Sequence, residues 1–407
     1  MEAVILAAGE GKRMRPLTIN RPKPLLPIAG KPIIAYHVER LKKLGVKRIW
    51  VVVNRNGERI KETLGTDGIE YVRQEKPLGT GHALLTVEDK VKEEFLLIFG
   101  DTYFEDSLEG LASYDGMAIG VYQVPDVSRY GAIVEKDGKV ECIKEKSLSG
   151  PGMIFAGVAK LNASIFSKLR ELKPSPRGEI ELTDALIGLG IYKLKDKWLD
   201  VGYPWNLLEA NEIELKKKES YIKGEVEEGV TVRGKVIVEE GALVKSGTYI
   251  EGPVYIGKNC VVGPNSYLRA HTMLEANVKV GFSCEVKNSI VMRDTKIPHL
   301  SYVGDSIIGE HCNFGAGLKI ANLRFDEANV KVTIKGVKQD SGRRKFGAVI
   351  GDNVKTGVNV SIMPGVKIGA NSIIGAHTLV FEDVEENTYY RVNEDVIRRE
   401  VGKDEHI

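Results

Sequence analysis

Residues 256–286 read IGKNCVVGPNSYLRAHTMLEANVKVGFSCEV, with an apolar residue at every sixth position. The residues of this register are Ile256, Val262, Leu268, Leu274, Val280 and Val286. A second register of the same period runs through Ile350, Thr356, Ile362, Ile368 and Ile374. A six-residue repeat predicts a parallel β-helix, in which three short strands form each coil and apolar side chains stack inside.

The repeat also divides the chain into domains. Between the two registers, residues 321–347 are polar and basic and lack the six-residue period. A long insertion without repeats is typical of a functional loop. Upstream of the repeat, residues 207–220 have the composition of a polar connecting helix. We therefore expect an N-terminal domain over residues 1–206, a linker helix over 207–224, and the β-helix with a C-terminal tail over 225–407.

The N-terminal domain alternates short apolar runs with helical patterns. Apolar runs lie at residues 3–8, 49–53, 95–99 and 117–124, and Pro32 opens an amphipathic stretch. This alternation predicts an α/β, Rossmann-like domain with an open, mostly parallel sheet. Ligands of such sheets bind beyond the carboxyl ends of the strands, which is the edge where we expect the functional residues.

Composition limits the kind of protein this is. The 58 basic residues nearly balance the 56 acidic ones, so the net charge of +2 offers no field for bulk nucleic-acid binding. Neither a signal-peptide pattern nor an apolar run of about 18 residues is present, so we expect a cytoplasmic protein without membrane contact. The charged fraction of 28% and the scarcity of Gln follow the direction seen in thermophiles.

The first apolar run leads into a loop suited to phosphate. Residues 6–14 read LAAGEGKRM, and residues 21–25 read RPKPL. Glycines allow the backbone N–H groups to close on a polyphosphate, which Lys12, Arg13 and Lys23 would neutralise. A simple tight turn would explain the glycines but not three cations in the next few residues. The pattern therefore favours a nucleotide site.

With these motifs, residues 1–206 resemble the sugar-1-phosphate nucleotidylyltransferases. The resemblance implies that Arg13 and Lys23 are the catalytic residues that contact the triphosphate and the sugar phosphate. It implies a nucleotide site made of Leu6, Ala8, Gly9, Gly11, Gln74, Gly79 and Thr80, in which Gln and Gly read a pyrimidine base. It implies a sugar-phosphate site made of Tyr130, Gly131, Glu145, Lys146 and Gly157. Finally, it implies that Asp101 and Asp200 hold Mg²⁺.

Two positions leave open which nucleoside triphosphate is the substrate. Phe155 and Asp200 stand where the uridylyltransferase branch usually carries Asn, and in this the chain is more similar to glucose-1-phosphate thymidylyltransferases. UTP and dTTP both remain candidates, as do plain and N-acetylated sugars.

The β-helix resembles the left-handed hexapeptide acyltransferases, which are trimers with acetyl-CoA bound between subunits. More specifically, residues 225–380 resemble the acetyltransferase half of the bifunctional N-acetylglucosamine-1-phosphate uridylyltransferase/glucosamine-1-phosphate acetyltransferases. The resemblance assigns the catalytic base to His299, because a neutral imidazole accepts an amine proton near pH 7. It assigns the acetyltransferase site to Arg269, Lys287, Tyr302, Asn313, Asn322 and Lys331. The family Lys expected at 328 is Ala328 here, so either Lys331 or Lys335 takes its role.

Two functional hypotheses follow. The first is a bifunctional enzyme that acetylates an amino-sugar-1-phosphate, with glucosamine-1-phosphate as the expected acceptor, and transfers a nucleotidyl group to a sugar-1-phosphate. The alternative is a nucleotidylyltransferase whose β-helix serves only oligomerisation or regulation, as in ADP-glucose and GDP-mannose pyrophosphorylases. The His299-x-x-Tyr302 segment favours the first hypothesis. A non-enzymatic scaffold would have lost Arg13, Lys23 or the two aspartates, and all are present.

Overall fold

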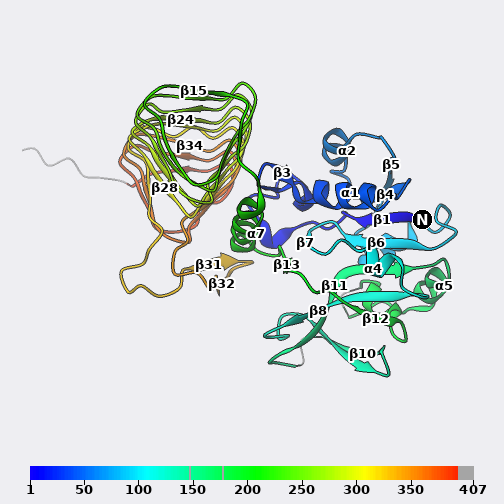
Figure 1. Ribbon diagram of the computed structural model, residues 1–407. Helices are drawn as coiled ribbons and strands as arrows, with labels where there is room; N and C mark the ends of the chain where they lie inside the picture. The colour runs from blue at the N-terminus through cyan, green and yellow to red at the C-terminus, as the bar shows by residue number, and fades with distance from the viewer. Residues whose placement is uncertain (146–147, 177, 393–407) are drawn as a thin grey trace, which may run out of the picture.

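A computed structural model describes residues 1–145, 148–176 and 178–392, and it contains two domains joined by one helix (Figure 1). The N-terminal sheet domain lies at one end and the β-helix at the other. Helix α7 (Pro204–Lys217) lies between them. The predicted combination of folds is confirmed, and α7 begins three residues before the expected linker helix at 207.

The N-terminal sheet has nine strands in the order β5-β4-β1-β6-β11-β8-β12-β10-β9. Their bounds are β1 (Glu2–Leu6), β4 (Ile49–Val53), β5 (Ile69–Arg73), β6 (Phe95–Phe99), β8 (Ala118–Val124), β9 (Gly131–Lys136), β10 (Lys139–Glu145), β11 (Gly152–Leu161) and β12 (Gly190–Lys193). Strands β5, β4, β1 and β6 are parallel, whereas β11 runs antiparallel to both β6 and β8. The expected parallel sheet therefore occupies one half only. The other half is mixed. A two-residue turn joins β9 to its antiparallel neighbour β10, and β11 runs antiparallel to β6, β8 and β9.

Both faces of the parallel half are covered. Ile5, Val51 and Ile98 are buried in a cluster on one face, and Val4, Val52 and Leu97 are buried on the other. This is why the strands are continuous apolar runs. The helices of the domain are α1 (Ile33–Lys43), α2 (Glu58–Leu64), α3 (Thr80–Leu85), α4 (Glu109–Ala112), α5 (Ser164–Glu171), α6 (Leu182–Ala185), η1 (Lys12–Met14) and η2 (Lys23–Leu25). Two small ribbons pair β2 (Pro27–Ile28) with β3 (Lys31–Pro32) and β7 (Thr102–Phe104) with β13 (Trp198–Asp200).

The C-terminal domain is a three-faced parallel β-helix (Figure 1). The first face contains β14 (Tyr221–Ile222), β17 (Val236–Val238), β20 (Val254–Ile256), β23 (Met273–Leu274), β26 (Ile290–Val291), β29 (Ile307–Ile308), β33 (Val349–Ile350) and β36 (Lys367–Ile368). The second contains β15 (Glu225–Val226), β18 (Leu243–Val244), β21 (Val261–Val262), β24 (Lys279–Phe282), β27 (Lys296–His299), β34 (Lys355–Thr356), β37 (Ile373–Ile374) and β39 (Tyr389–Tyr390). The third contains β16 (Thr231–Arg233), β19 (Tyr249–Glu251), β22 (Tyr267–Leu268), β25 (Glu285–Lys287), β28 (Tyr302–Gly304), β30 (Lys319–Ile320), β35 (Ser361–Ile362) and β38 (Leu379–Val380).

The stack of inward side chains continues between the two registers seen in the sequence. It passes through Val291, Ile297, Val303, Ile308, Phe314 and Ile320, all at most 1% exposed. Two of its steps, from Val286 to Val291 and from Val303 to Ile308, are five residues instead of six. Tyr267 accordingly pairs with Glu285 eighteen residues on, but Glu285 pairs with Tyr302 seventeen residues on. The shortened corners hide the period in sequence without interrupting the coil.

The first face of the β-helix packs against the sheet domain and α7. Its outward residues Met273, Ile290, Ile307 and Val349 belong to one buried cluster. The same cluster contains Met14, Leu17, Leu26, Trp205 and Leu208 from the N-terminal side. Helix α7 is therefore buried on this side, although its sequence reads as a polar linker.

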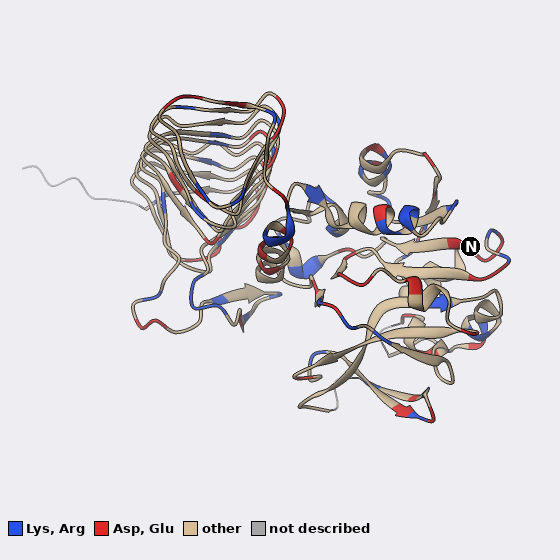
Figure 2. Cartoon of the chain, in the orientation of Figure 1, with Lys and Arg blue, Asp and Glu red and all other residues tan. Residues whose placement is uncertain are grey.

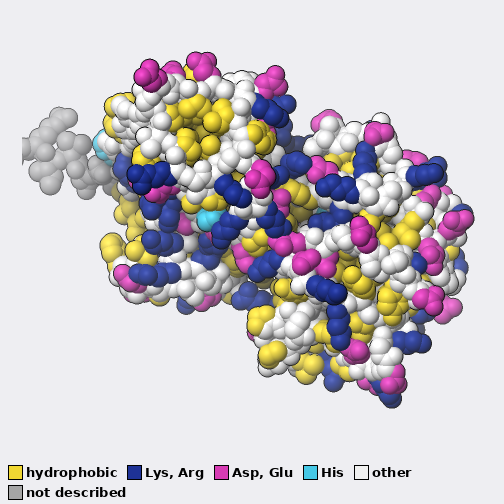
Figure 3. All heavy atoms as spheres, in the orientation of Figure 1, with side chains coloured by type: hydrophobic (Ala, Val, Ile, Leu, Met, Phe, Trp, Pro, Cys, Tyr) yellow, Lys and Arg dark blue, Asp and Glu magenta, His cyan; other side chains and the backbone are white. Residues whose placement is uncertain are grey.

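The insertion predicted at 321–347 forms a hairpin of β31 (Lys331–Ile334) and β32 (Val337–Asp340). Val330, Val332, Ile334 and Phe346 contribute to the interdomain cluster, and Phe346 contacts Trp205 of α7, so the insertion packs at the interface around this helix. Acidic and basic residues are interspersed over both domains (Figures 2 and 3). Within the described residues, no helix combines the length and apolarity that a membrane span needs.

Candidate active sites

A cavity of about 590 Å³ lies in the sheet domain beside the loop predicted to bind phosphate. Of the residues predicted for this site, its lining includes Leu6, Ala8, Gly9, Arg13, Lys23, Gln74, Gly79, Thr80, Asp101, Tyr130, Gly157 and Asp200. The structure thus gathers residues that are widely separated in the sequence, from Leu6 to Asp200, around one cavity. Lys12, Phe155 and Trp198 also line it, together with Glu179, which sequence reasoning missed.

The phosphate loop, residues 6–26, is held in one conformation by its own contacts. Gly11 has a φ of 63°, and its carbonyl accepts a hydrogen bond of 2.8 Å from Thr18 Oγ1. A Cβ at Gly11 would lie 3.1 Å from Lys23 Cβ, so glycine is required by both backbone angle and space. Lys23 is 5% exposed, and its ammonium lies 2.7 Å from Asp101 Oδ2.

The two predicted metal ligands are neighbours. Asp200 pairs in register with Thr102, directly after Asp101, which places both carboxylates at one edge of the cavity. Burial opposes ionisation of Asp101, but Lys23 and then Arg13 hold its pKa below 3.8. A side chain at Gly202 would lie 2.8 Å from Asp200 Oδ2 and 3.3 Å from the Arg13 guanidinium, so glycine there leaves room for both.

This donor set suits Mg²⁺. No cluster of three or more His, Cys, Asp or Glu that could hold a metal occurs in the described part of the chain. Two carboxylates facing a phosphate-binding loop nevertheless match the usual protein share of a Mg²⁺ site, since substrate phosphates and water complete the coordination. Asp101 and Asp200 therefore fit the ion.

The residues predicted to read the base are held by contacts within the protein. Gln74 is 6% exposed, and its Nε2 lies 3.1 Å from Gly79 O and 3.0 Å from His82 Nδ1. With the amide in this orientation, Gln74 Oε1 is left to accept a hydrogen bond from a ligand. Gly79 has a φ of 98°, and a Cβ there would lie 2.6 Å from Ile180 O. Thr80 Oγ1 accepts a hydrogen bond from Leu182 N, which ties this segment to α6.

The predicted sugar-phosphate residues lie in two groups. Tyr130 and Gly157 line the cavity, and burial followed by the nearby Asp200 raises the pKa of Tyr130 to about 12. Gly131 is paired with Glu145 across β9 and β10, and Gly131 is not among the residues that line that cavity. Lys146 lies outside the described residues.

On the β-helix, Asp305 organises the predicted acetyltransferase residues. Asp305 is 3% exposed, and its Oδ2 accepts Lys287 Nζ at 3.0 Å and also Asn322 Nδ2. Asn322 Nδ2 lies 3.1 Å from Tyr302 Oη. Gly304 makes room for this contact, because a Cβ there would lie 2.5 Å from Tyr302 Oη. Three predicted site residues therefore meet at one aspartate on the third face.

The other predicted residues surround this group unevenly. Arg269 stands one coil above Lys287 on the third face and pairs with Glu285 at 2.9 Å. His299 ends β27 and is exposed at the corner that precedes Tyr302. Asn313 lies apart, bridging Lys296 and Lys355 on the second face. Lys331 is exposed at the start of the hairpin, opposite Asp340.

Two supporting residues were missed in the sequence. Asp305 was visible in the segment after Tyr302, but aspartates at β-helix corners are common turn residues, and nothing in sequence set it apart. Asn288 links Asp305 to helix α7, because its Nδ2 lies 2.9 Å from both Asp305 Oδ1 and Glu212 Oε1. Such contacts depend on domain packing and leave no local pattern.

A phosphate-loop sheet domain followed by a hexapeptide β-helix defines a two-domain nucleotidyl transferase. Residues 2–217 match the family model described as nucleotidyl transferase, residues 250–341 the GMPPB C-terminal domain, and residues 347–382 six bacterial transferase hexapeptide repeats. The chain is 48% identical to the Bifunctional protein GlmU of Methanococcus maripaludis, over 98% of this chain and 99% of that protein.

Two further relatives cover nearly the whole chain. Identity is 47% to the Bifunctional protein GlmU of Methanocaldococcus jannaschii, over 98% of this chain and 100% of that protein. The chain is 44% identical to the Bifunctional sugar-1-phosphate nucleotidylyltransferase/acetyltransferase of Sulfurisphaera tokodaii, over 96% of this chain and 100% of that protein. The chain therefore belongs to the family of bifunctional GlmU proteins, and the resemblance predicted from its motifs is confirmed.

Proposed function

We propose that this chain is a bifunctional enzyme of nucleotide-sugar synthesis. It acetylates an amino-sugar-1-phosphate with acetyl-CoA and transfers a nucleotidyl group from a nucleoside triphosphate to a sugar-1-phosphate, releasing pyrophosphate. The observation that carries this proposal is the presence of two separate groups of converging polar side chains, one in each domain. Oligomerisation alone does not require Lys287, Tyr302 and Asn322 to converge around the buried carboxylate of Asp305.

Nucleotidyl transfer takes place in the cavity of the sheet domain. A sugar-1-phosphate oxygen attacks the α-phosphorus, the bond to the bridging oxygen breaks, and pyrophosphate leaves. Such a reaction depends on positioning and charge neutralisation rather than on a covalent nucleophile. Lys23 and Arg13 supply fixed positive charge, and the loop supplies backbone N–H groups. Mg²⁺ held by Asp101 and Asp200 would neutralise phosphate oxygens.

Gln74 accounts for the open choice of nucleotide. Its Oε1 is free to accept the N3–H of a pyrimidine, and uracil and thymine both carry that donor. Gln74 therefore favours UTP and dTTP over CTP, whose N3 carries no hydrogen, without choosing between UTP and dTTP.

Acetyl transfer takes place on the third face of the β-helix. The amine of the sugar attacks the thioester carbonyl, the C–S bond breaks, and the thiol of CoA leaves. His299 accepts the amine proton and returns it to the sulfur. Lys287 and Arg269 bind the sugar phosphate, while Tyr302 and Asn322 orient the acceptor. Glucosamine-1-phosphate is the acceptor that we favour.

The acetyltransferase site is completed by a second copy of the chain in a trimer. His299 is paired in register with Phe282, which is 45% exposed, and is followed by Leu300, which is 54% exposed. Exposed apolar side chains beside a catalytic base indicate a surface that another subunit covers. Acetyl-CoA would lie between subunits, and acetylation would require the oligomer.

A substrate screen tests the proposal. Thiol release from acetyl-CoA is measured with glucosamine-1-phosphate and galactosamine-1-phosphate, and pyrophosphate release is measured with each triphosphate and sugar-1-phosphate. We expect both products from one preparation. Pyrophosphate release without thiol release from any amino sugar would leave the single-activity alternative.

A further inference from the structure

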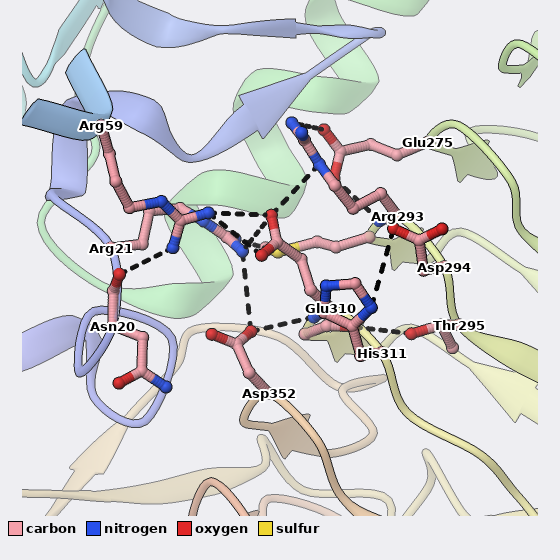
Figure 4. Close-up of polar contacts among 12 residues, drawn as sticks. Asn20, Arg21, Arg59, Glu275, Arg293, Asp294, Thr295, Glu310, His311 and Asp352 are labelled. Atoms are coloured by element: carbon pink, nitrogen blue, oxygen red, sulfur yellow. Dashed lines mark hydrogen bonds and ion pairs between the residues drawn. The ribbon is translucent and has the colours of Figure 1, made fainter. Parts of the chain in front are cut away.

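The phosphate loop is fastened to the β-helix by a buried cluster of charges (Figure 4). Arg21 is 3% exposed, and its guanidinium pairs with Glu310 Oε1 at 2.6 Å and Asp352 Oδ1 at 3.6 Å. It also contacts the sulfur of Met292. All three partners belong to the β-helix, whereas Arg21 belongs to the loop that carries Lys23.

Glu310 is the centre of this cluster. Its carboxylate also pairs with Arg59 at 3.1 Å and with Arg293 at 3.2 Å. Burial alone would raise the pKa of Glu310, but Arg21, Arg59 and Arg293 together hold it below 4.5. The carboxylate is therefore ionised and balanced where it contacts Arg21.

The segment from Arg21 to Lys23 is stiff. Pro22 and Pro24 fix two of the φ angles, with Pro22 at −57°. Leu25 N donates to Pro22 O, and Leu26 N donates to Lys23 O, each at 3.0 Å. A displacement of Arg21 must therefore move Lys23, whose ammonium contacts Asp101 at 2.7 Å in the nucleotide cavity.

Apolar contacts hold the same loop on the same face. A Cβ at Gly351 of the β-helix would lie 3.1 Å from Pro16 Cβ. Met14 and Leu17 share a buried cluster with Ile307 and Val349. These apolar contacts already bury the loop against the β-helix. A charged side chain at position 21 is therefore not required to pack it there. Moreover, buried ion pairs contribute little net stability compared with apolar residues of similar size, which favours a role in orientation.

We propose that the β-helix is a structural part of the nucleotidyltransferase site and that Arg21 is a positioning residue for Lys23. Glu310 and Asp352 fix the guanidinium, the two prolines transmit its position, and Lys23 is held where the substrate phosphates meet Asp101. Nucleotidyl transfer thus depends on residues of the acetyltransferase domain that never touch the nucleotide.

The test compares full-length variants, each of which alters one charged residue of the cluster around Arg21 and Glu310. Arg21→Met and Glu310→Gln break the link to the loop, and Asp352→Asn weakens it. Arg293→Met is the matched control, because it removes another arginine from Glu310 without touching the loop. Each variant is assayed for pyrophosphate release and, in the same preparation, for thiol release from acetyl-CoA.

We expect Arg21→Met and Glu310→Gln to lower the kcat of nucleotidyl transfer about tenfold or more, since misplacement of a catalytic group by about 1 Å can cost about 100-fold. The KM for the triphosphate should change less than kcat, because the loop backbone and Gln74 remain. Thiol release should stay near the wild-type rate in these variants. The Arg293→Met variant should keep near-wild-type nucleotidyl transfer. The double variant Arg21→Met/Glu310→Gln should be no worse than the poorer single variant.

The inference rests on nucleotidyl transfer in the sheet domain, and the two can fail separately. Absence of pyrophosphate release by the wild type would overturn the proposed function. An active wild type with near-normal Arg21→Met and Glu310→Gln variants would overturn the inference alone, as would an equal loss in Arg293→Met. If Arg21→Met does not fold, the nucleotidyl-transfer rates of Glu310→Gln and Asp352→Asn are compared with that of Arg293→Met. A loss confined to the first two supports the inference, and equal rates overturn it.

Discussion

Replacing Asp305 by Asn should selectively impair acetyl transfer. The change keeps the size of the side chain, and Oδ1 can still accept Asn288 Nδ2. At the other position, however, an NH₂ group replaces the oxygen that accepts both Lys287 and Asn322. Lys287 Nζ and Asn322 Nδ2 would then face a third donor in place of the oxygen that they share, and the Lys287 side chain is only 18% exposed.

The magnitude follows from this lost acceptor. A hydrogen bond to a charged group contributes roughly 1.5–3 kcal/mol, and leaving the donor unpaired costs a similar amount. Because about 1.4 kcal/mol corresponds to tenfold in rate, kcat/KM for the amino-sugar phosphate should fall roughly 10- to 100-fold. Pyrophosphate release should change less than about twofold, since Asp305 does not line the nucleotide cavity.

The assay measures free thiol at saturating acetyl-CoA and pyrophosphate in the same preparation. Asp383→Asn is the matched control, because Asp383 pairs with Lys367 on the same β-helix and Lys367 is 19% exposed. Asp383→Asn should retain acetyl transfer. A folded Asp305→Asn variant with acetyl transfer within about twofold of wild type would refute the role given to Asp305.

Asp101→Ala and Asp200→Ala should each lower metal-dependent pyrophosphate release by roughly two orders of magnitude or more and leave thiol release intact; near-normal nucleotidyl transfer in both would contradict the metal assignment. Gln74→Ala should weaken discrimination of UTP and dTTP against CTP by about 1–3 kcal/mol, and an equal loss for every triphosphate would show that Gln74 does not read the base. Because the folded-state pKa of Glu310 is depressed below 4.5, its contribution to stability is present above the unfolded pKa and is lost as pH falls through the folded one. The Tm of the wild type should therefore decrease more than that of Glu310→Gln between about pH 6 and about pH 3, and parallel curves would count against the charge cluster.

Much of the architecture could be predicted because it rests on local patterns. The six-residue period depends only on which side chains point into the coil, and the phosphate loop depends on adjacent glycines and cations. Asp101 and Asp200 were predicted as a pair through the family resemblance, and the structure places Asp101 just after β6 and Asp200 at the end of β13. The mixed half of the sheet could not be predicted, since the direction of β11 depends on its pairing with β6 and β8, which are distant in sequence.

The packing of the domains was the main feature that sequence reasoning missed. One signal existed: outward residues of the first face, such as Met273, Ile290 and Ile307, are apolar, whereas Lys279 and Lys296 occupy outward positions of the second. A covered face needs apolar side chains and an exposed one does not. Finding that signal requires the register of each strand, which the five-residue steps obscure.

The central claim is that one chain carries two separable active sites, and His299→Ala tests it most directly. In one preparation of wild type and variant, thiol release from acetyl-CoA with glucosamine-1-phosphate and pyrophosphate release from UTP or dTTP with a sugar-1-phosphate are measured side by side. We predict that the wild type gives both products, and that His299→Ala loses thiol release while pyrophosphate release and oligomeric state stay unchanged. Retention of thiol release by His299→Ala, or loss of both activities in a correctly folded variant, would contradict the account.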